Sequence, residues 1–224
     1  MQTYSHFLIT ALICDLLGRR TPPIKTGKAF LWGSVAPDIP LIGLTIGYAL
    51  SNKISGSNAS TFGDAYDELY FHNPLWIVLT SLFHAPFLIL FYAGLGAALN
   101  KRKSLGRLSK AGKPLCWFAA GCALHSLLDI PTHAGDGPAL LFPFEWHARF
   151  NSPVSYWDPD HHGDIFAPIE AALDFLLIVY FLVRCIQSRK NRRRIIDTMT
   201  SVEVSPITER KSHRSGAGGS VDQL

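Results

Sequence analysis

Long apolar runs constrain this chain more than any other feature of its sequence. A helix needs about 20 apolar residues to cross a bilayer, and four runs have that character, at residues 29–50, 74–99, 114–130 and 164–187. In lipid the backbone must satisfy its own hydrogen bonds, and a helix does this within a single segment. We therefore predict an all-α fold, a polytopic bundle of membrane helices.

Two details refine the predicted number and form of the spans. Residues 3–17 form a shorter apolar run, which is either a fifth span or a helix at the membrane interface. In the run at 29–50, Pro37 and Pro40 bracket Asp38. Proline lacks the backbone N–H that a helix requires, so we predict four to five spans, one of them broken at Pro37–Pro40.

The charged residues indicate which side each loop occupies. Residues 18–28 and 100–113 and the tail after residue 187 are basic, whereas the loops at 51–73 and 131–163 are acidic. Four spans place all three basic segments on one side of the membrane. Because basic loops favour the cytoplasm, we predict a multi-pass protein with a cytoplasmic C-terminal tail.

Composition divides the chain into two parts. Only 17% of the residues are charged, against about 25% in soluble domains, and the mean hydropathy is +0.16 despite a polar tail. We predict a membrane-embedded helical domain at 1–187 and a disordered tail at 188–224, basic at first and then rich in Ser and Gly. The four cysteines all lie in apolar runs, which does not suggest a disulfide framework.

The sequence HSLLDIPTH places His125, Asp129 and His133 at intervals of four. Residues at this spacing share one helix face, and an ionisable residue in an apolar span indicates a functional site. Imidazole and carboxylate together suit a metal ion. Pro131 disfavours helix at the residue before it, so we predict a His125/Asp129 pair. His133 then belongs to the loop at 131–163, which lies on the outer side in this layout, or to the groups that support the ligands.

Other ionisable residues in or beside the apolar runs have structural explanations when taken singly. His6 could be a hydrogen-bonded interfacial residue, Asp38 a helix cap, and Glu170 with Asp174 a polar contact between helices. Together they form a set that suits metal binding, because every apolar run carries at least one such residue. The candidates are His6, Asp38, His72, His84, His125, Asp129, His133, Glu170 and Asp174.

The chemistry expected of this set is hydrolysis. A mixed His/carboxylate site without thiolate suits zinc, or else manganese or iron, in an open catalytic site. Such an ion activates a water molecule for attack on an ester or phosphoester. Glu170, if it is not a ligand, could act as general base, and His133 is the second catalytic candidate. Arg149 could orient an anionic headgroup or could be an ordinary surface residue.

Several familiar motifs are absent from the sequence. It contains no P-loop, no G-x-G-x-x-G, no G-x-S-x-G and no H-E-x-x-H. No helix is predicted to carry a basic face with interleaved aromatic residues, so we expect no nucleic-acid partner.

The chain resembles a family of bacterial inner-membrane proteins described as membrane-bound metal-dependent hydrolases, which are distantly similar to zinc-dependent phospholipase C. The resemblance covers roughly residues 1–175. It is carried by TYSH at the N-terminus, APDIP, SLFHAP, HSLLDIPTH with LLFPF, and SPVSYWDPDHHG.

The resemblance implies metal-ligand roles for a set of residues and a location in the bacterial inner membrane. His72 is a further candidate ligand, although the chain departs there from the compact His-Arg…His-Ser pattern of the family. The implied ligands are His6, Asp38, His84, His125 and Asp129.

Three functional interpretations follow from the sequence. The first is a metal-dependent hydrolase of an ester or phosphoester, with a lipid or envelope molecule as substrate. The second is a non-catalytic membrane protein that binds metal or handles ions. The third is a membrane scaffold stabilised by buried polar contacts. The substrate, the number of ions and the oligomeric state stay open.

Overall fold

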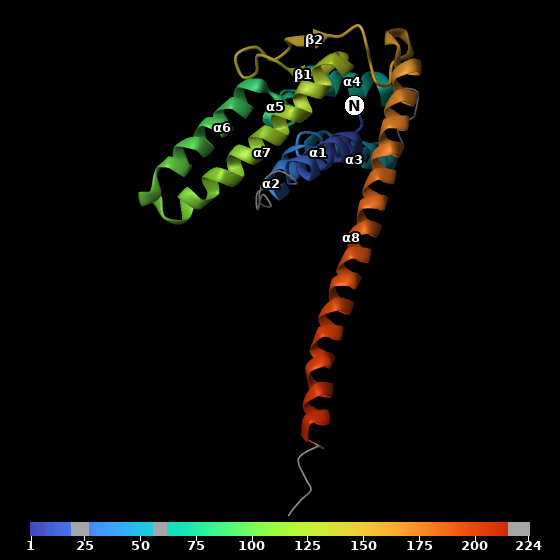
Figure 1. Ribbon diagram of the computed structural model, residues 1–224. Coiled ribbons are helices and arrows are strands. Elements are labelled where there is room, and N and C mark those ends of the chain that lie inside the picture. The colour runs from blue at the N-terminus through green and yellow to red at the C-terminus, as the bar shows by residue number, and fades with distance from the viewer. Residues whose placement is uncertain (19–26, 56–61, 215–224) are drawn as a thin grey trace, which may run out of the picture. The chain divides into compact units, whose positions relative to one another are not determined.

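The computed structural model describes residues 1–18, 27–55 and 62–214, and these residues are predominantly helical (Figure 1). The helices are α1 (Thr3–Gly18), α2 (Gly27–Gly33), α3 (Asp38–Ser55), α4 (Phe62–His72), α5 (Pro74–His84), α6 (Pro86–Lys101), α7 (Arg107–Asp129) and α8 (Gly163–Arg214). Two short strands, β1 (Ala134–Ala139) and β2 (Arg149–Asn151), pair antiparallel. The predicted all-α membrane fold is confirmed, with this small sheet as an addition.

The chain separates into two compact units, Met1–Leu177 and Ile178–Leu224. The first unit contains α1 to α7, both strands and the beginning of α8. In the second unit the backbone of α8 stays helical to Arg214. The sequence predicts a disordered tail from residue 188, and this stays a prediction; the Arg and Lys residues at the start of that segment are good helix formers. The rest of the predicted tail, residues 215–224, lies outside the described residues.

Two segments of the described chain are single helices long and apolar enough to cross a membrane, Arg107–Thr132 and Gly163–Ile196. The number rises to four if each of two bent helix pairs forms one span. One pair is α2 with α3, bent by 46°, which confirms the predicted break near Pro37. α1 is a shorter apolar helix of 16 residues.

The second bend, of 50° between α5 and α6, is absent from the prediction of one continuous span at 74–99. Its cause is Pro86, the first residue of α6. The residue before a proline avoids the helical region, and Ala85 has an extended backbone with φ −66° and ψ 125°. α5 therefore ends at His84, and this places that side chain at a helix terminus.

The predicted loops contain more regular structure than the sequence indicates. In the segment 51–73, α3 continues to Ser55 and α4 follows, packed on α5. Asn73 then caps α5, its side chain accepting hydrogen bonds from the N–H groups of Leu75 and Trp76. In the basic segment 100–113, α7 already begins at Arg107. The segment 131–163 carries both strands, which tertiary packing imposes on a sequence without strand periodicity.

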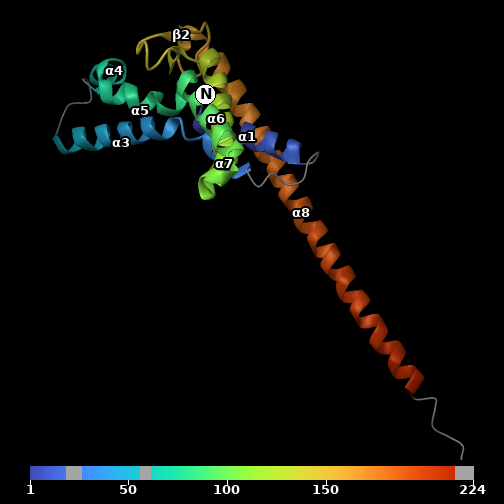
Figure 2. The same cartoon turned by 90° about the vertical axis from the view of Figure 1, so that its left-hand side faces the viewer.

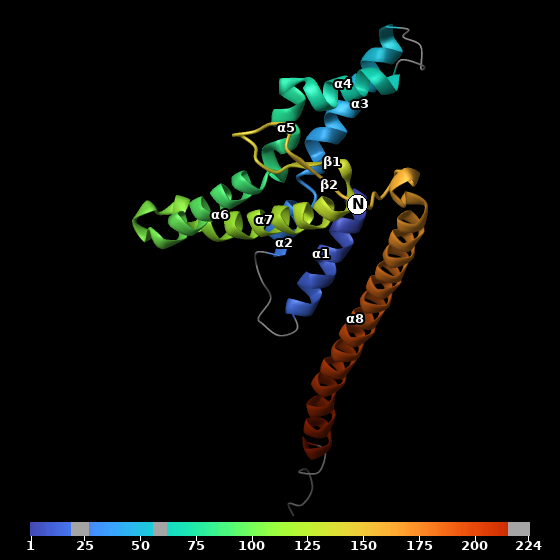
Figure 3. The same cartoon turned by 90° about the horizontal axis from the view of Figure 1, so that it is seen from above.

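Helix α7 is the centre of the first unit. It lies beside α6 (Figure 1), and α2 crosses it near the middle of its length (Figure 3). α3 lies beside α5 (Figure 2). A Cβ atom on Gly33 would lie 2.1 Å from the carbonyl oxygen of Phe118, and one on Gly121 would lie 2.3 Å from that of Phe30. Only glycine permits this approach, which brings the residues after α2 against α7.

Candidate metal centre

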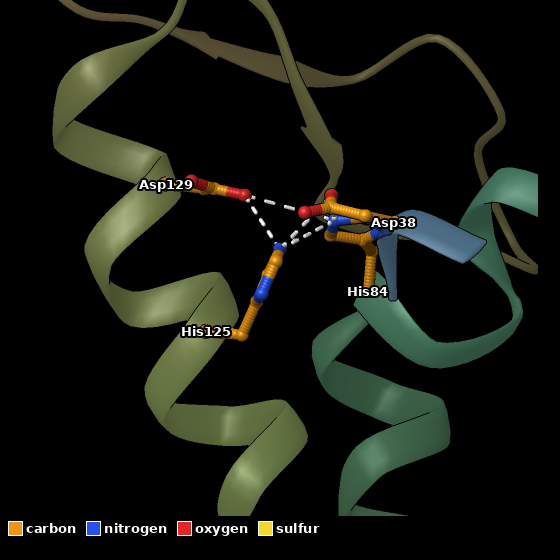
Figure 4. A group of neighbouring side chains, drawn as sticks. All are labelled: Asp38, His84, His125 and Asp129. Carbon is orange, nitrogen blue, oxygen red and sulfur yellow. Dashed lines mark hydrogen bonds and ion pairs between the residues drawn. The ribbon is translucent and has the colours of Figure 1, made fainter. Parts of the chain in front are cut away.

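Four side chains from three parts of the fold converge beside the end of α7 (Figure 4). They are Asp38 at the start of α3, His84 at the end of α5, and His125 and Asp129 on α7. One ligand atom from each lies within 4.8 Å of all the others. His125 is fully buried and Asp129 is 3% exposed. The predicted His125/Asp129 pair is thus brought together with two of its expected partners.

Local sequence explains how each residue reaches this point. The i, i+4 spacing places His125 and Asp129 on one face of α7. Asp38 and His84 both occur where a proline interrupts a span, so each side chain projects from a helix terminus. The two breaks in the apolar runs therefore supply half of the cluster.

The hydrogen bonds of the two histidines define their tautomers. Nδ1 of His125 lies 2.8 Å from the carbonyl oxygen of Ser34, and Nδ1 of His84 lies 2.8 Å from that of Thr80. A carbonyl oxygen can only accept, so each Nδ1 carries a proton and donates it. In the neutral ring, Nε2 then presents a lone pair, the arrangement found in metal-binding histidines.

The spacing of the four facing atoms suits a bound cation. The two Nε2 atoms are 3.1 Å apart, and Nε2 of His125 lies 2.9 Å from Oδ2 of Asp129 and 3.3 Å from Oδ1 of Asp38. Nε2 of His84 lies 3.7 Å from each carboxylate. With both Nδ1 atoms protonated, the two Nε2 lone pairs and the two carboxylates face one another as acceptors, an arrangement that a cation can bridge.

A divalent ion fits both the charge and the spacing of this cluster. Two carboxylates and two neutral imidazoles sum to a charge of −2. Bonds of ~2.0–2.1 Å hold neighbouring ligand atoms about 2.9–3.4 Å apart, from octahedral to tetrahedral angles, within the range of the distances above. The four residues can therefore hold a metal ion. Nitrogen and oxygen ligands suit zinc, manganese or iron.

The N-terminal residues support the carboxylates of the cluster. Thr3 donates a 2.6 Å hydrogen bond from Oγ1 to Oδ2 of Asp38. The Met1 amino group and Nε2 of His6 each lie 2.9 Å from Oδ1 of Asp129. The His6 ring also stacks on His125 with ring centroids 3.8 Å apart. His6, implied as a ligand by the family resemblance, thus contacts a carboxylate of the cluster and does not belong to the four-residue group.

Three further candidates lie away from the cluster. His72 is the last residue of α4, and its ring centroid is 6.3 Å from that of His147. Oε1 of Glu170 accepts a 2.7 Å hydrogen bond from the backbone N–H of Gln2, and Oδ2 of Asp174 accepts one of 2.8 Å from Ser5. These two carboxylates hold the start of α1 against α8.

His133 lies beside the cluster and shares a cavity with it. Its Nδ1 donates a 2.9 Å hydrogen bond to the carbonyl oxygen of Asp129, and burial lowers its pKa below the usual value. The cavity has a volume of about 40 Å³, and Asp38, His84 and Asp129 line it together with His133. Other residues that line the cavity, including Tyr70 and Asp136, were not predicted, because no local pattern in the sequence connects them to the cluster.

Replacing Thr3 with valine should weaken metal binding by about 10- to 100-fold, because Oδ2 of Asp38 loses the donor that orients it. Thr3→Ser is the matched control, since serine keeps the hydroxyl, and its affinity should stay near that of the wild type. Metal affinity is measured by competition with a chelator in detergent. Equal affinities in the valine and serine variants would show that this hydrogen bond does not support the site.

Fold and site define a helical membrane protein with a buried cluster of two aspartates and two histidines able to hold a metal ion. The chain belongs to the YdjM inner membrane protein family, whose model matches residues 1–196. This match confirms that the chain belongs to a bacterial membrane protein family, and the matched region includes the whole cluster. Comparisons with curated proteins and with solved structures found no matching protein.

Proposed function

We propose that this protein is a membrane-embedded metal-dependent hydrolase that acts on an ester or phosphoester. The observation that carries the proposal is the cavity shared by the metal-ligand cluster and His133. A purely structural metal site is closed by its protein ligands, whereas a catalytic site keeps one side open to water and substrate. The mixed nitrogen and oxygen ligand set supports the same assignment.

Each residue of the site has a role in this proposal. Asp38, His84, His125 and Asp129 would hold the ion, and Thr3 and His6 would orient the two carboxylates. A divalent ion bound there would polarise a substrate oxygen and lower the pKa of a water molecule. The chain's own residues must then accept the proton and exclude bulk water.

His133 is the proton acceptor that the site supports best. Its Nδ1–H is committed to the carbonyl oxygen of Asp129, so Nε2 of the neutral ring is the basic atom. Nε2 makes no hydrogen bond within the described residues, so it is free to accept a proton. Glu170, the other base candidate, does not line this cavity and is bonded to Gln2. The proposal therefore gives the role of general base to His133.

The location of the site in a membrane protein supports a lipid or envelope ester as substrate.

We expect His133→Gln to lower turnover by about 10²- to 10⁴-fold with unchanged metal content, because general-base catalysis contributes on that order. His147→Gln is the matched control, since its side chain is 62% exposed and it does not line the cavity. Turnover is measured on a panel of carboxylic esters, phosphodiesters and lipids, with and without chelator.

The same panel separates hydrolysis from the alternative function. Chelator-sensitive turnover that His133→Gln abolishes would support the hydrolase. Stoichiometric metal with no turnover of any substrate would instead favour a membrane protein that binds metal or handles ions without catalysis.

A further inference from the structure

Arg149 lies at the start of β2 and lines the same cavity as Asp38, His84 and Asp129. It is the one Lys or Arg residue among the described residues that line this cavity. Its Nη1 donates to the carbonyl oxygen of Gly137 and approaches the Tyr70 hydroxyl at 3.4 Å. Arg149 is thus a half-buried cation on the wall of the proposed active site.

Aromatic rings hold the guanidinium in place. The Arg149 Cζ atom lies 4.9 Å from the centroid of the Tyr70 ring and 5.5 Å from that of Phe71, so cation–π attraction favours this position. Burial raises the pKa of Tyr70 to about 12, which keeps the phenol protonated. The Tyr70 hydroxyl donates to the carbonyl oxygen of Asp136 at 2.8 Å and therefore accepts from Arg149. The guanidinium is oriented before any ligand arrives.

The remaining donors of this guanidinium have no partner among the described residues. Arginine carries five N–H donors, and the contacts above use only Nη1. Among the side chains that the structure describes, no carboxylate forms an ion pair with it. Asp136 also lines the cavity; its Oδ2 accepts from Trp157 Nε1 at 2.8 Å, and its buried Oδ1 has no hydrogen-bond partner among the described residues and forms no ion pair with Arg149. An oriented cation with free donors, facing a cavity beside a metal centre, suits an anionic ligand.

We propose that Arg149 forms an anion subsite that binds the phosphoryl oxygens of the substrate, which makes this protein selective for phosphoesters over neutral carboxylic esters. This inference rests on the proposed function, which places the phosphoryl group of the substrate beside the metal ion. The planar guanidinium matches two phosphoryl oxygens at once, whereas a neutral ester offers no charge to bind. The cavity has room for about three water-sized groups, which suits the terminal oxygens of one phosphoryl group.

The test is binding of inorganic phosphate to the purified, metal-loaded full-length protein in detergent, measured by calorimetry. We expect the wild type to bind phosphate and Arg149→Met to bind it about 10- to 100-fold more weakly with unchanged metal content, because charge-assisted hydrogen bonds are lost. Arg107→Met is the matched control, since Arg107 is exposed at the start of α7 and does not line the cavity. Its phosphate affinity should equal that of the wild type.

Arg149→Lys keeps the charge but loses the planar fork, and its phosphate affinity should lie between those of the wild type and Arg149→Met. If Arg149→Met does not fold, Arg149→Lys is the variant compared with the wild type. Wild-type affinity in the folded Arg149 variants would overturn the proposal, as would a wild type that does not bind phosphate. Because the test needs no turnover, absent hydrolysis would overturn the hydrolase and leave this result unchanged. Conversely, hydrolysis of carboxylic esters without phosphate binding would overturn only the anion subsite.

Discussion

Asp129→Asn should yield a folded protein that retains less than about one tenth of its metal. Asp129 has one carboxylate oxygen 2.9 Å from Nε2 of His125 and the other 2.9 Å from Nε2 of His6. An amide cannot supply the negative charge that balances a divalent ion. We therefore expect the metal affinity to fall by at least ~100-fold, which is more than the loss of a residue that only orients a ligand costs. Metal content is measured by elemental analysis of detergent-purified protein.

The control for this variant is Asp160→Asn, because Asp160 is an exposed aspartate in the segment between α7 and α8 and lies outside the cluster. It should retain wild-type metal content. A melting curve of each variant distinguishes loss of the ion from loss of the fold. Near-stoichiometric metal in folded Asp129→Asn protein would show that Asp129 is not a ligand.

Gly121→Val should disrupt the contact between α2 and α7 and remove the metal site with it. A Cβ atom at this position would lie 2.3 Å from the carbonyl oxygen of Phe30 and 2.8 Å from Cα of Gly33, so the helices must separate. Overpacking of this kind costs about 1–3 kcal/mol of stability. Separation also withdraws the Ser34 carbonyl from His125 and moves Asp38 away from the other ligands.

Gly94→Ala provides the comparison, because a Cβ atom there would meet no other atom within 4 Å. Alanine favours helix over glycine by roughly 0.5–1 kcal/mol, so this variant should melt at the wild-type temperature or slightly above. Both variants are compared by thermal melting and metal content in detergent. Wild-type melting and metal content in Gly121→Val would mean that close approach of the two backbones is not needed for the site.

Much of the architecture follows from local sequence. The length of the apolar runs predicts membrane helices, and the prolines around Asp38 predict the break between α2 and α3. The bend between α5 and α6 has an equally local cause, since Pro86 follows Ala85. The interval of four between His125 and Asp129 places them on one face of a helix, because the α-helix repeats every 3.6 residues.

The assembly of the site depended on tertiary structure. Nothing local determines that Asp38 and His84 meet His125, because their positions follow from the crossing of α2 and α7 at Gly33 and Gly121. The same packing places His6 against Asp129, leaves His72 beside His147, and turns Glu170 toward the start of α1. These positions depend on contacts between residues far apart in the chain.

The sequence by itself therefore determined the kind of fold, the breaks in its spans and the central His125/Asp129 pair, since each depends on neighbours within one or two helical turns. Only the tertiary structure decided which of the other polar residues join that pair. It also brought Arg149 from a segment expected to be a loop to the wall of the same cavity. The physical reason is that helix periodicity and proline geometry act locally, whereas helix crossings position residues that no sequence interval connects.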